Sequence, residues 1–192
     1  MNKPVYLDYQ ATVPIRPEVV MHMNEVSLEV GNPNSIHTFG RRATNTVLTA
    51  KDKLAEFLHV NSREIAFTSG ATESIELGLT GVIARAVEDH PEKQWEIITS
   101  PIEHSAVLDT CKWIEEKYPN VTVKYLEVDE FGQISSENLQ EAITSNTLLV
   151  TLMYANNEIG TIFPLRKIGK IIAKHRSINQ SQYPIFHSDA TQ

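Results

Sequence analysis

Residues 95–118, WEIITSPIEHSAVLDTCKWIEEKY, decide the fold because they place a strand, a turn and a helix in direct succession. The stretch opens on an apolar run of strand length. Behind it, apolar side chains recur at helical spacing, namely Val107, Leu108, Cys111 and Ile114. A strand that leads into an amphipathic helix is typical of α/β proteins, in which successive strands pair in parallel through right-handed crossovers.

The same alternation extends in both directions from this stretch. Strands are predicted over residues 64–68, 95–100, 121–129, 147–155 and 183–189. Helices are predicted over residues 73–88, 105–118, 135–144 and 166–176, the third with a serine at its start as N-cap. This order predicts an α/β fold with a three-layer, doubly wound, mostly parallel sheet of about five strands.

Residues 1–63 have a different pattern. Two helices are predicted over residues 16–30 and 41–60, and the turn-rich sequence GNPNSIHTFG at residues 31–40 joins them. We therefore expect an N-terminal helical arm over residues 1–63, followed by the α/β part over residues 64–192.

Composition limits the classes of partner. The 192-residue chain has 17 basic and 24 acidic residues and a net charge of −7, which argues against a nucleic acid as partner. Its single cysteine excludes an internal disulfide and suits a reducing compartment. The N-terminal sequence lacks the apolar region of a signal peptide, and no stretch is apolar over the length of a membrane span. A cytoplasmic location is therefore expected.

Small and polar residues follow four of the five predicted strands. The segments are TSGATES at 68–74, PIEHS at 101–105, NNEIG at 156–160 and DATQ at 189–192. Ligands of doubly wound sheets bind outside the carboxyl ends of the strands, so these side chains are expected at one edge. In the first segment Gly70 precedes a helix, whose free amides could cradle a phosphate together with the hydroxyls of Ser69 and Thr72.

Each segment also has a purely structural interpretation. The first could be a plain helix start, His104 could cap or face solvent, Asn156 and Asn157 could form a turn, and Asp189 could be an N-cap. Their convergence at one edge instead favours a ligand with a phosphate, an aromatic ring and a cationic nitrogen. Pyridoxal phosphate has these parts, because its ring nitrogen must be protonated to act as an electron sink and a carboxylate raises the pKa of that nitrogen.

Six motifs taken together resemble those of a known family. The motifs YLDYQATVP, GNPNSIHTFGR, FTSGATES, EHSAVLDT, NNEIG and HSDATQ occur in the order and at the spacing of cysteine desulfurases of the NifS/IscS type. These are fold-type I pyridoxal-phosphate enzymes, grouped with the class V aminotransferases. The resemblance extends from Val5 to Gln192 and implies that residues 64–192 are an incomplete large, cofactor-binding domain of this fold.

The resemblance implies that six residues bind pyridoxal phosphate: Ala71, Thr72, His104, Asn157, Asp189 and Gln192. The first two would hold the phosphate, and the histidine would stack on the pyridine ring. The asparagine and the glutamine would contact the ring substituents, including the phenolic oxygen. The aspartate would pair with the ring nitrogen.

The resemblance also implies a reaction. Family members convert L-cysteine to L-alanine and form a persulfide on an enzyme cysteine, which supplies sulfur for iron–sulfur cluster assembly or tRNA thiolation. They are homodimers and pass sulfur to an acceptor or scaffold protein. The family's Schiff-base lysine, nucleophilic cysteine, substrate-binding arginine and small domain lie downstream of DATQ. Residues 1–192 are therefore expected to contain no catalytic residue, to be inactive alone, and to bind pyridoxal phosphate weakly or not at all.

Two residues of this chain bear on that expectation. Cys111 lies on the apolar stripe of a predicted helix, where a thiol acts as a small hydrophobe, so we expect it to be structural and no substitute for the nucleophile. Val13 stands where the family has a threonine, with little expected consequence. The favoured interpretation is the N-terminal piece of a longer desulfurase.

Alternatives remain open. The chain could belong to another class V enzyme, such as a selenocysteine lyase or an aminotransferase, or it could be a non-catalytic or split subunit that pairs with a partner chain. A hydrolase built on Ser69, His104 and Asp189 is disfavoured because the nucleophile-elbow motif is missing. The scattered histidines show no metal-ligand spacing, so no metal site is predicted.

Overall fold

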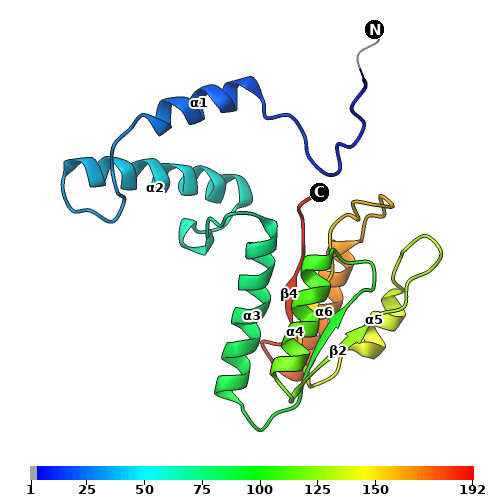
Figure 1. Ribbon diagram of the computed structural model, residues 1–192. Helices are drawn as coiled ribbons and strands as arrows, with labels where there is room; N and C mark the ends of the chain where they lie inside the picture. The colour runs from blue at the N-terminus through cyan, green and yellow to red at the C-terminus, as the bar shows by residue number, and fades with distance from the viewer. Residues whose placement is uncertain (1–3) are drawn as a thin grey trace. The chain divides into compact units, whose positions relative to one another are not determined.

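The structure is a computed structural model that describes residues 4–192 (Figure 1). The chain forms two compact units, which divide between Phe67 and Thr68. The sequence predicted a different kind of division, into domains: a helical arm over residues 1–63 and a cofactor-binding domain over residues 64–192. That division remains a prediction. No helix in the described part of the chain is both long and apolar enough to cross a membrane.

The first unit contains helix α1 (Pro17–Ser27), helix α2 (Thr38–Leu58) and a short 3₁₀ turn, η1 (Ser62–Glu64). Both α-helices were predicted. Helix α2 begins at the N-cap His37, whose side chain accepts a hydrogen bond from the Gly40 amide. A glycine is required at residue 40 because a Cβ atom there would lie 2.1 Å from the carbonyl oxygen of Ser35. The turn-rich linker can therefore pack directly on the start of α2.

The second unit is a parallel sheet of four strands, covered by helices. The strands are β1 (Trp95–Thr99), β2 (Val121–Tyr125), β3 (Thr147–Thr151) and β4 (Ile185–His187), in the spatial order β2-β1-β3-β4. The helices are α3 (Ala71–Asp89), α4 (Ser105–Lys117), α5 (Ser136–Ala142) and α6 (Leu165–Asn179). Every residue of β3 is buried, as expected for a central strand that is covered on both faces.

Two buried clusters lie on opposite faces of the sheet and make the three layers. Residues of α3 and α4 pack with Ile97 and Leu149. Residues of α5 and α6 pack with Ile98 and Val150, which are the next residues along β1 and β3. Because successive strand side chains point to opposite faces, this alternation confirms the predicted doubly wound α/β fold (Figure 1).

The prediction of a strand over residues 64–68 was wrong. Ile65 has extended backbone dihedral angles, but no segment of residues 4–192 pairs with it in a ladder. The local preference of EIAFT for an extended chain is therefore real, whereas a strand also needs a neighbour to receive its backbone hydrogen bonds. The sheet of the described chain has four strands and not five.

Candidate cofactor site at the strand ends

Three loops meet at the carboxyl edge of the sheet. They follow β1 (residues 100–104), β3 (residues 152–164) and β4 (residues 188–192). The Asn156 side-chain amide donates to the carbonyl of Ile102, 2.7 Å away, and the Tyr154 amide donates to the carbonyl of Asp189, also at 2.7 Å. The structure thereby joins the loops that carry the predicted residues His104, Asn157 and Asp189.

Asp189 lies directly beyond β4 and is partly exposed. Its Oδ1 atom accepts hydrogen bonds from the Thr191 amide at 3.0 Å and from the Thr191 hydroxyl at 2.6 Å. Both bonds use one oxygen, and none from a residue within 4–192 reaches Oδ2. The local turn thus fixes the carboxylate while one of its oxygens stays open to a ligand.

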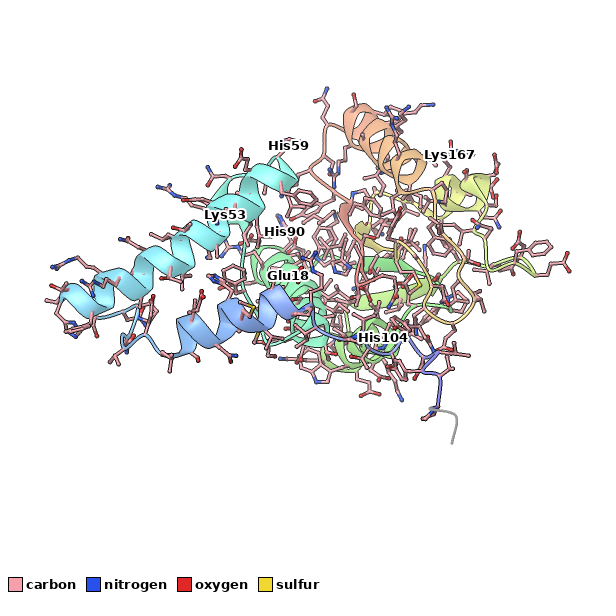
Figure 2. The ribbon with its side chains drawn as sticks, turned by 90° about the horizontal axis from the view of Figure 1, so that it is seen from above. Glu18, Lys53, His59, His90, His104 and Lys167 are labelled. Carbon is pink, nitrogen blue, oxygen red and sulfur yellow. The ribbon has the colours of Figure 1, made fainter. Side chains whose placement is uncertain are left out.

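His104, labelled in Figure 2, is exposed and is the N-cap of α4. Its Nδ1 atom accepts a hydrogen bond from the Ala106 amide at 3.1 Å. The capping interpretation is therefore correct, and it does not exclude ring stacking. The cap makes Nδ1 the acceptor of this bond and fixes the position of an exposed ring.

Ala71 and Thr72 are the first two residues of α3. The N-cap is Gly70, which provides no side-chain hydrogen bond to the first turn, so an anion can bind there. Glu73 also lies in the first turn, but its carboxylate accepts a hydrogen bond from the Ser69 amide at 2.6 Å. Hydrogen bonds from the Ser69 side chain and backbone lower the pKa of Glu73, so it stays ionised beside the predicted phosphate position.

Asn157 and Gln192 complete the predicted set. The Asn157 side-chain amide donates to Glu158 at 3.1 Å, on the loop that follows β3. Gln192 is exposed at the end of the sequence, three residues beyond Asp189. The roles of all six residues in cofactor binding stay predictions.

Sequence reasoning missed the importance of Glu103, which is only 5% exposed. Its Oε1 atom accepts hydrogen bonds from the Met153 amide at 2.9 Å and the Ser100 hydroxyl at 3.0 Å. Burial raises the pKa of Glu103 to about 7; the two hydrogen bonds oppose this, and the negative charge of Asp189 adds to it. The available signal was the position of a carboxylate four residues behind a strand that is mostly buried.

Asn156 is likewise buried, and the sequence analysis treated it as a turn former. That interpretation is correct, since its Oδ1 accepts hydrogen bonds from the amides of Glu158 and Ile159 at 2.8 and 2.9 Å. The same side chain also bonds to the β1 loop, as described above. A residue can therefore form a local turn and join two strand ends at once.

His187, the last residue of β4, is joined to β3 by a 2.8 Å hydrogen bond between its Nδ1 atom and the Thr151 hydroxyl. Burial lowers the pKa of His187, and the nearby Asp189 carboxylate opposes that shift. Three further buried polar atoms near the strand ends lack a hydrogen-bond partner among residues 4–192: Thr99 Oγ1, Glu103 Oε2 and Ser188 Oγ. Unpartnered polar atoms at the ligand edge of the sheet fit a polar cofactor.

Other candidate groups do not form a site in the described part of the chain. Cys111 is fully buried, and burial raises the pKa of its thiol to about 12, so the thiol is not activated as a nucleophile. Ser69 and His104 hydrogen-bond to Glu73 and Ala106, and not to each other, which removes the basis for a Ser/His pair. Among residues 4–192 no group of three His, Cys, Asp or Glu side chains could hold a metal ion.

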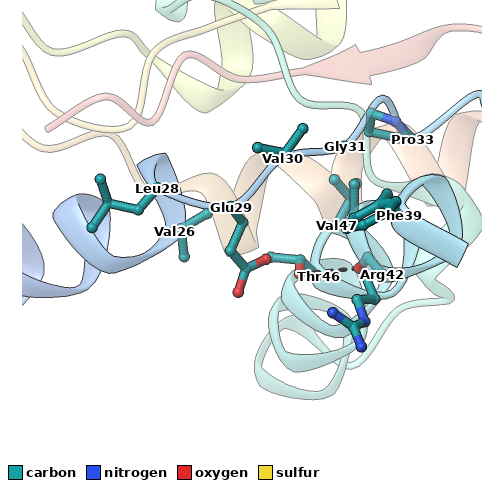
Figure 3. A pocket seen from close by; sticks show the side chains of 11 residues that line it. Val26, Leu28, Glu29, Val30, Gly31, Pro33, Phe39, Arg42, Thr46 and Val47 are labelled. Carbon is teal, nitrogen blue, oxygen red and sulfur yellow. Dashed lines mark hydrogen bonds between the residues drawn. The ribbon is translucent and has the colours of Figure 1, made fainter.

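Two grooves lie outside the three strand-end loops. One of about 500 Å³ lies within the first unit and is mostly apolar; Figure 3 shows Val30, Phe39 and Val47 along it. The other, of about 380 Å³, lies between α3 and α4 and includes Thr72 and Trp113. Neither contains a carboxylate, an imidazole and a helix start together, so neither competes with the strand ends.

The fold, the strand-end loops and the comparisons agree on the family. The chain belongs to the aminotransferase class-V family, whose model matches residues 5–181. Its relatives include the cysteine desulfurases IscS of Methanosarcina thermophila (45% identical) and of Buchnera aphidicola subsp. Baizongia pistaciae (44% identical). Both alignments cover 100% of this chain, but only 44% and 45% of the relatives. The chain thus spans less than half the length of these curated relatives.

Solved structures show the same relationship. A NifS-like protein superposes with a TM-score of 0.87 at 38% identity, over 98% of this chain and 49% of that one. A structure described as SspA in complex with cysteine superposes with a TM-score of 0.86 at 34% identity, over 97% and 50%. A C-DES mutant with glycine linked to a pyridoxal-phosphate cofactor is 20% identical, with a TM-score of 0.66, and supports the fold alone. The expected likeness to NifS/IscS-type desulfurases is confirmed.

Proposed function

We propose that these 192 residues provide one side of the pyridoxal-phosphate site of a cysteine desulfurase. The reaction is the conversion of L-cysteine to L-alanine, with the sulfur transferred to an enzyme cysteine. The observation that carries the proposal is the hydrogen-bonded junction of three strand-end loops, which gathers an imidazole, an amide and a carboxylate at one edge. The desulfurase names of the relatives, and the cysteine bound to SspA, support the substrate.

Each proposed role follows from the chemistry of the group. The amides that begin α3, at Ala71 and Thr72, would bind the phosphate, since a helix start favours an anion. The His104 ring, whose position is fixed by its cap, would stack on the cofactor ring. The Asp189 carboxylate would accept a hydrogen bond from the protonated ring nitrogen, while Asn157 and Gln192 would contact the ring substituents.

The described residues fit this cofactor. When bound, pyridoxal phosphate supplies an electron sink for the carbanion that forms at the substrate carbon. Asp189 would stabilise the protonated ring nitrogen, because an opposite charge nearby raises the pKa of that nitrogen. The buried strand ends would exclude water from one side of the ring, since Thr99 and Thr151 are fully buried there.

Other parts of the activity lie outside these residues. We propose that the lysine that holds the cofactor covalently and the cysteine that receives sulfur are contributed by sequence that corresponds to the rest of the relatives. Residues 1–192 alone would then bind the cofactor weakly and would not turn over L-cysteine. A homodimeric assembly, a sulfur-accepting partner protein, a role in iron–sulfur cluster assembly and a cytoplasmic location stay predictions.

Complementation tests the proposal. Residues 1–192 would be co-expressed with the C-terminal part of the Methanosarcina thermophila relative, and alanine formed from L-cysteine would be measured. We expect activity from the pair and from neither part alone. Asp189→Asn should lower the rate by roughly 100-fold or more, because the ring nitrogen loses its charged partner. Cys111→Ala should retain most of the rate, and equal losses in the two variants would contradict the assigned roles.

A further inference from the structure

Glu103 accepts a hydrogen bond from a backbone amide that has no partner strand beyond the end of β1. Directly beyond β3, successive backbone amides donate to alternate neighbours. The amides of Leu152 and Tyr154 donate to carbonyls of His187 and Asp189 on the β4 side. The amide between them, from Met153, faces the β1 side, where β1 has already ended at Thr99.

The Glu103 carboxylate accepts that amide in place of a backbone carbonyl. The distance from the Met153 nitrogen to Oε1 is 2.9 Å, and both residues are buried. A buried amide without an acceptor destabilises the fold, so the Glu103 side chain takes the place of a backbone acceptor. The Ser100 hydroxyl donates to the same oxygen at 3.0 Å and fixes the direction of the carboxylate.

Asn156 makes a second link between the same two loops, through its bond to the Ile102 carbonyl. Ile102 and Glu103 therefore both bind the loop that follows β3, and His104 comes next in sequence. Because α4 begins directly afterwards, the position of the His104 ring depends on these two buried links. An exposed ring is thereby fixed by buried neighbours.

We propose that Glu103 is a positioning residue, whose carboxyl replaces the carbonyl that β1 no longer provides and so fixes the loop that carries His104 against the loop that carries Asn156 and Asn157. The inference rests on the proposed function only for what His104 contacts. The link itself is a property of the chain without cofactor.

The hydrogen bond between Glu103 and the Met153 amide also depends on the charge of Asp189, because that charge affects the ionisation of Glu103. Among residues 4–192, two titratable groups interact electrostatically with Glu103: the Asp189 carboxylate beyond β4 and the Cys111 thiol on α4. The thiol is neutral near pH 7, so Asp189 is the charge that matters there. When a cationic ring nitrogen neutralises Asp189, the ionised form of Glu103 becomes less unfavourable, and its bond to the Met153 amide becomes charge-assisted. Binding at Asp189 would then tighten the loop that holds His104.

The test follows backbone amides of the 192-residue chain by NMR as the pH is varied, without cofactor. The Met153 amide reports the link, and the Ala106 amide reports the His104 cap. We expect the Met153 resonance to titrate with a midpoint near neutral pH. Asp189→Asn should shift that midpoint to lower pH, because the repelling charge is gone, and Glu103→Gln should abolish the titration while it keeps an acceptor.

Glu103→Ala should remove the acceptor, so that the Met153 amide exchanges with solvent at least about 10-fold faster and the Ala106 resonance moves. The matched control is Glu115→Ala, since Glu115 also accepts a backbone amide from a neighbouring strand, that of Val123 at 2.9 Å. It should alter Val123 and leave Met153 and Ala106 unchanged.

Two results would overturn the proposal. One is a Met153 titration that persists in Glu103→Gln or ignores Asp189→Asn. The other is an Ala106 resonance that stays unmoved in a folded Glu103→Ala chain. Should Glu103→Ala fail to fold, the glutamine and asparagine variants still decide the matter. Since no cofactor is added, a failure here is separate from a failure of the complementation assay.

Discussion

The two units contain similar helices but bury them very differently. In the first unit α1 has no buried residue, and α2 has only Gly40 and Ala55. Phe57 of that unit is 79% exposed. In the second unit, every α-helix contributes to one of two closed clusters on the sheet. Helical pattern thus predicts where a helix forms, whereas only a facing surface supplies most of its stability.

Local bonds hold the first unit, and long-range packing holds the second. The Thr44 hydroxyl bonds to the Pro33 carbonyl at 2.6 Å, and Asn61 and Glu64 form a capping box around η1. Each of these bonds spans only a short stretch of sequence. We therefore expect the second unit to unfold as a cooperative whole and the first to open at much lower free energy.

Hydrogen exchange should show the largest difference between the two units. Amides of β3, such as Val150, should exchange only when the second unit unfolds. Amides of α1 should exchange at least about 1,000-fold faster, because no buried side chain resists their opening. Exchange followed residue by residue in the intact chain measures this. Equal protection in α1 and β3 would mean that the first unit has a stabilising surface of its own.

A pair of leucines compares the units at the level of single side chains. Leu79 on α3 is fully buried, whereas Leu58 at the end of α2 is 56% exposed. Leu79→Ala should lower the free energy of unfolding by about 2–5 kcal/mol. Leu58→Ala should cost less than about 1 kcal/mol. Denaturant unfolding measures both losses, followed by the fluorescence of Trp95 and Trp113 for the second unit and by amide exchange in α2 for the first. Similar losses would contradict the comparison.

The pH dependence of stability also distinguishes the two units, because the buried carboxyl group with a raised pKa, that of Glu103, belongs to the second unit. The pKa of Glu103 is about 7 in the folded protein, against an ordinary value of 4.5. Between these two pH values the folded state holds more protons, so the group makes the free energy of unfolding fall as the pH rises. From pH 4.5 to above 7 the expected loss is about 3 kcal/mol.

Glu103→Gln should remove that pH-dependent loss, as measured by denaturant unfolding at pH 5 and pH 8. Glu115→Gln, at an exposed carboxylate, should keep it. If the wild type and Glu103→Gln lost stability in parallel over this range, the assigned pKa would be wrong.

The sequence predicted much of this architecture, and its failures have physical causes. The helix from residue 105 could be predicted because the spacing of Val107, Cys111 and Ile114 places them on one helix face. All three are buried in the structure. The Ser135 N-cap was also readable, since its hydroxyl accepts amides of the following turn. The strand over residues 64–68 failed because pairing is a property of two segments, and the sequence of one cannot reveal a missing neighbour.

The candidate site was predictable only in part. Asp189 and His104 could be found because Asp189 ends the last predicted strand and His104 lies four residues beyond another, at the edge where such sheets bind ligands. Glu103 could not be found in this way, because its role depends on the direction of one amide, that of Met153. Which residue satisfies a buried backbone group is decided by register between strands, and the sequence does not display that register.

The most direct test of the account is to locate the cofactor after chemical trapping. Residues 1–192, combined with the C-terminal part of the Methanosarcina thermophila relative, would be treated with pyridoxal phosphate and borohydride, and the labelled lysine identified by peptide mass analysis. We expect one stoichiometric label on the C-terminal part, lost or strongly reduced with Asp189→Asn. A stoichiometric label on a lysine within residues 1–192 would contradict it.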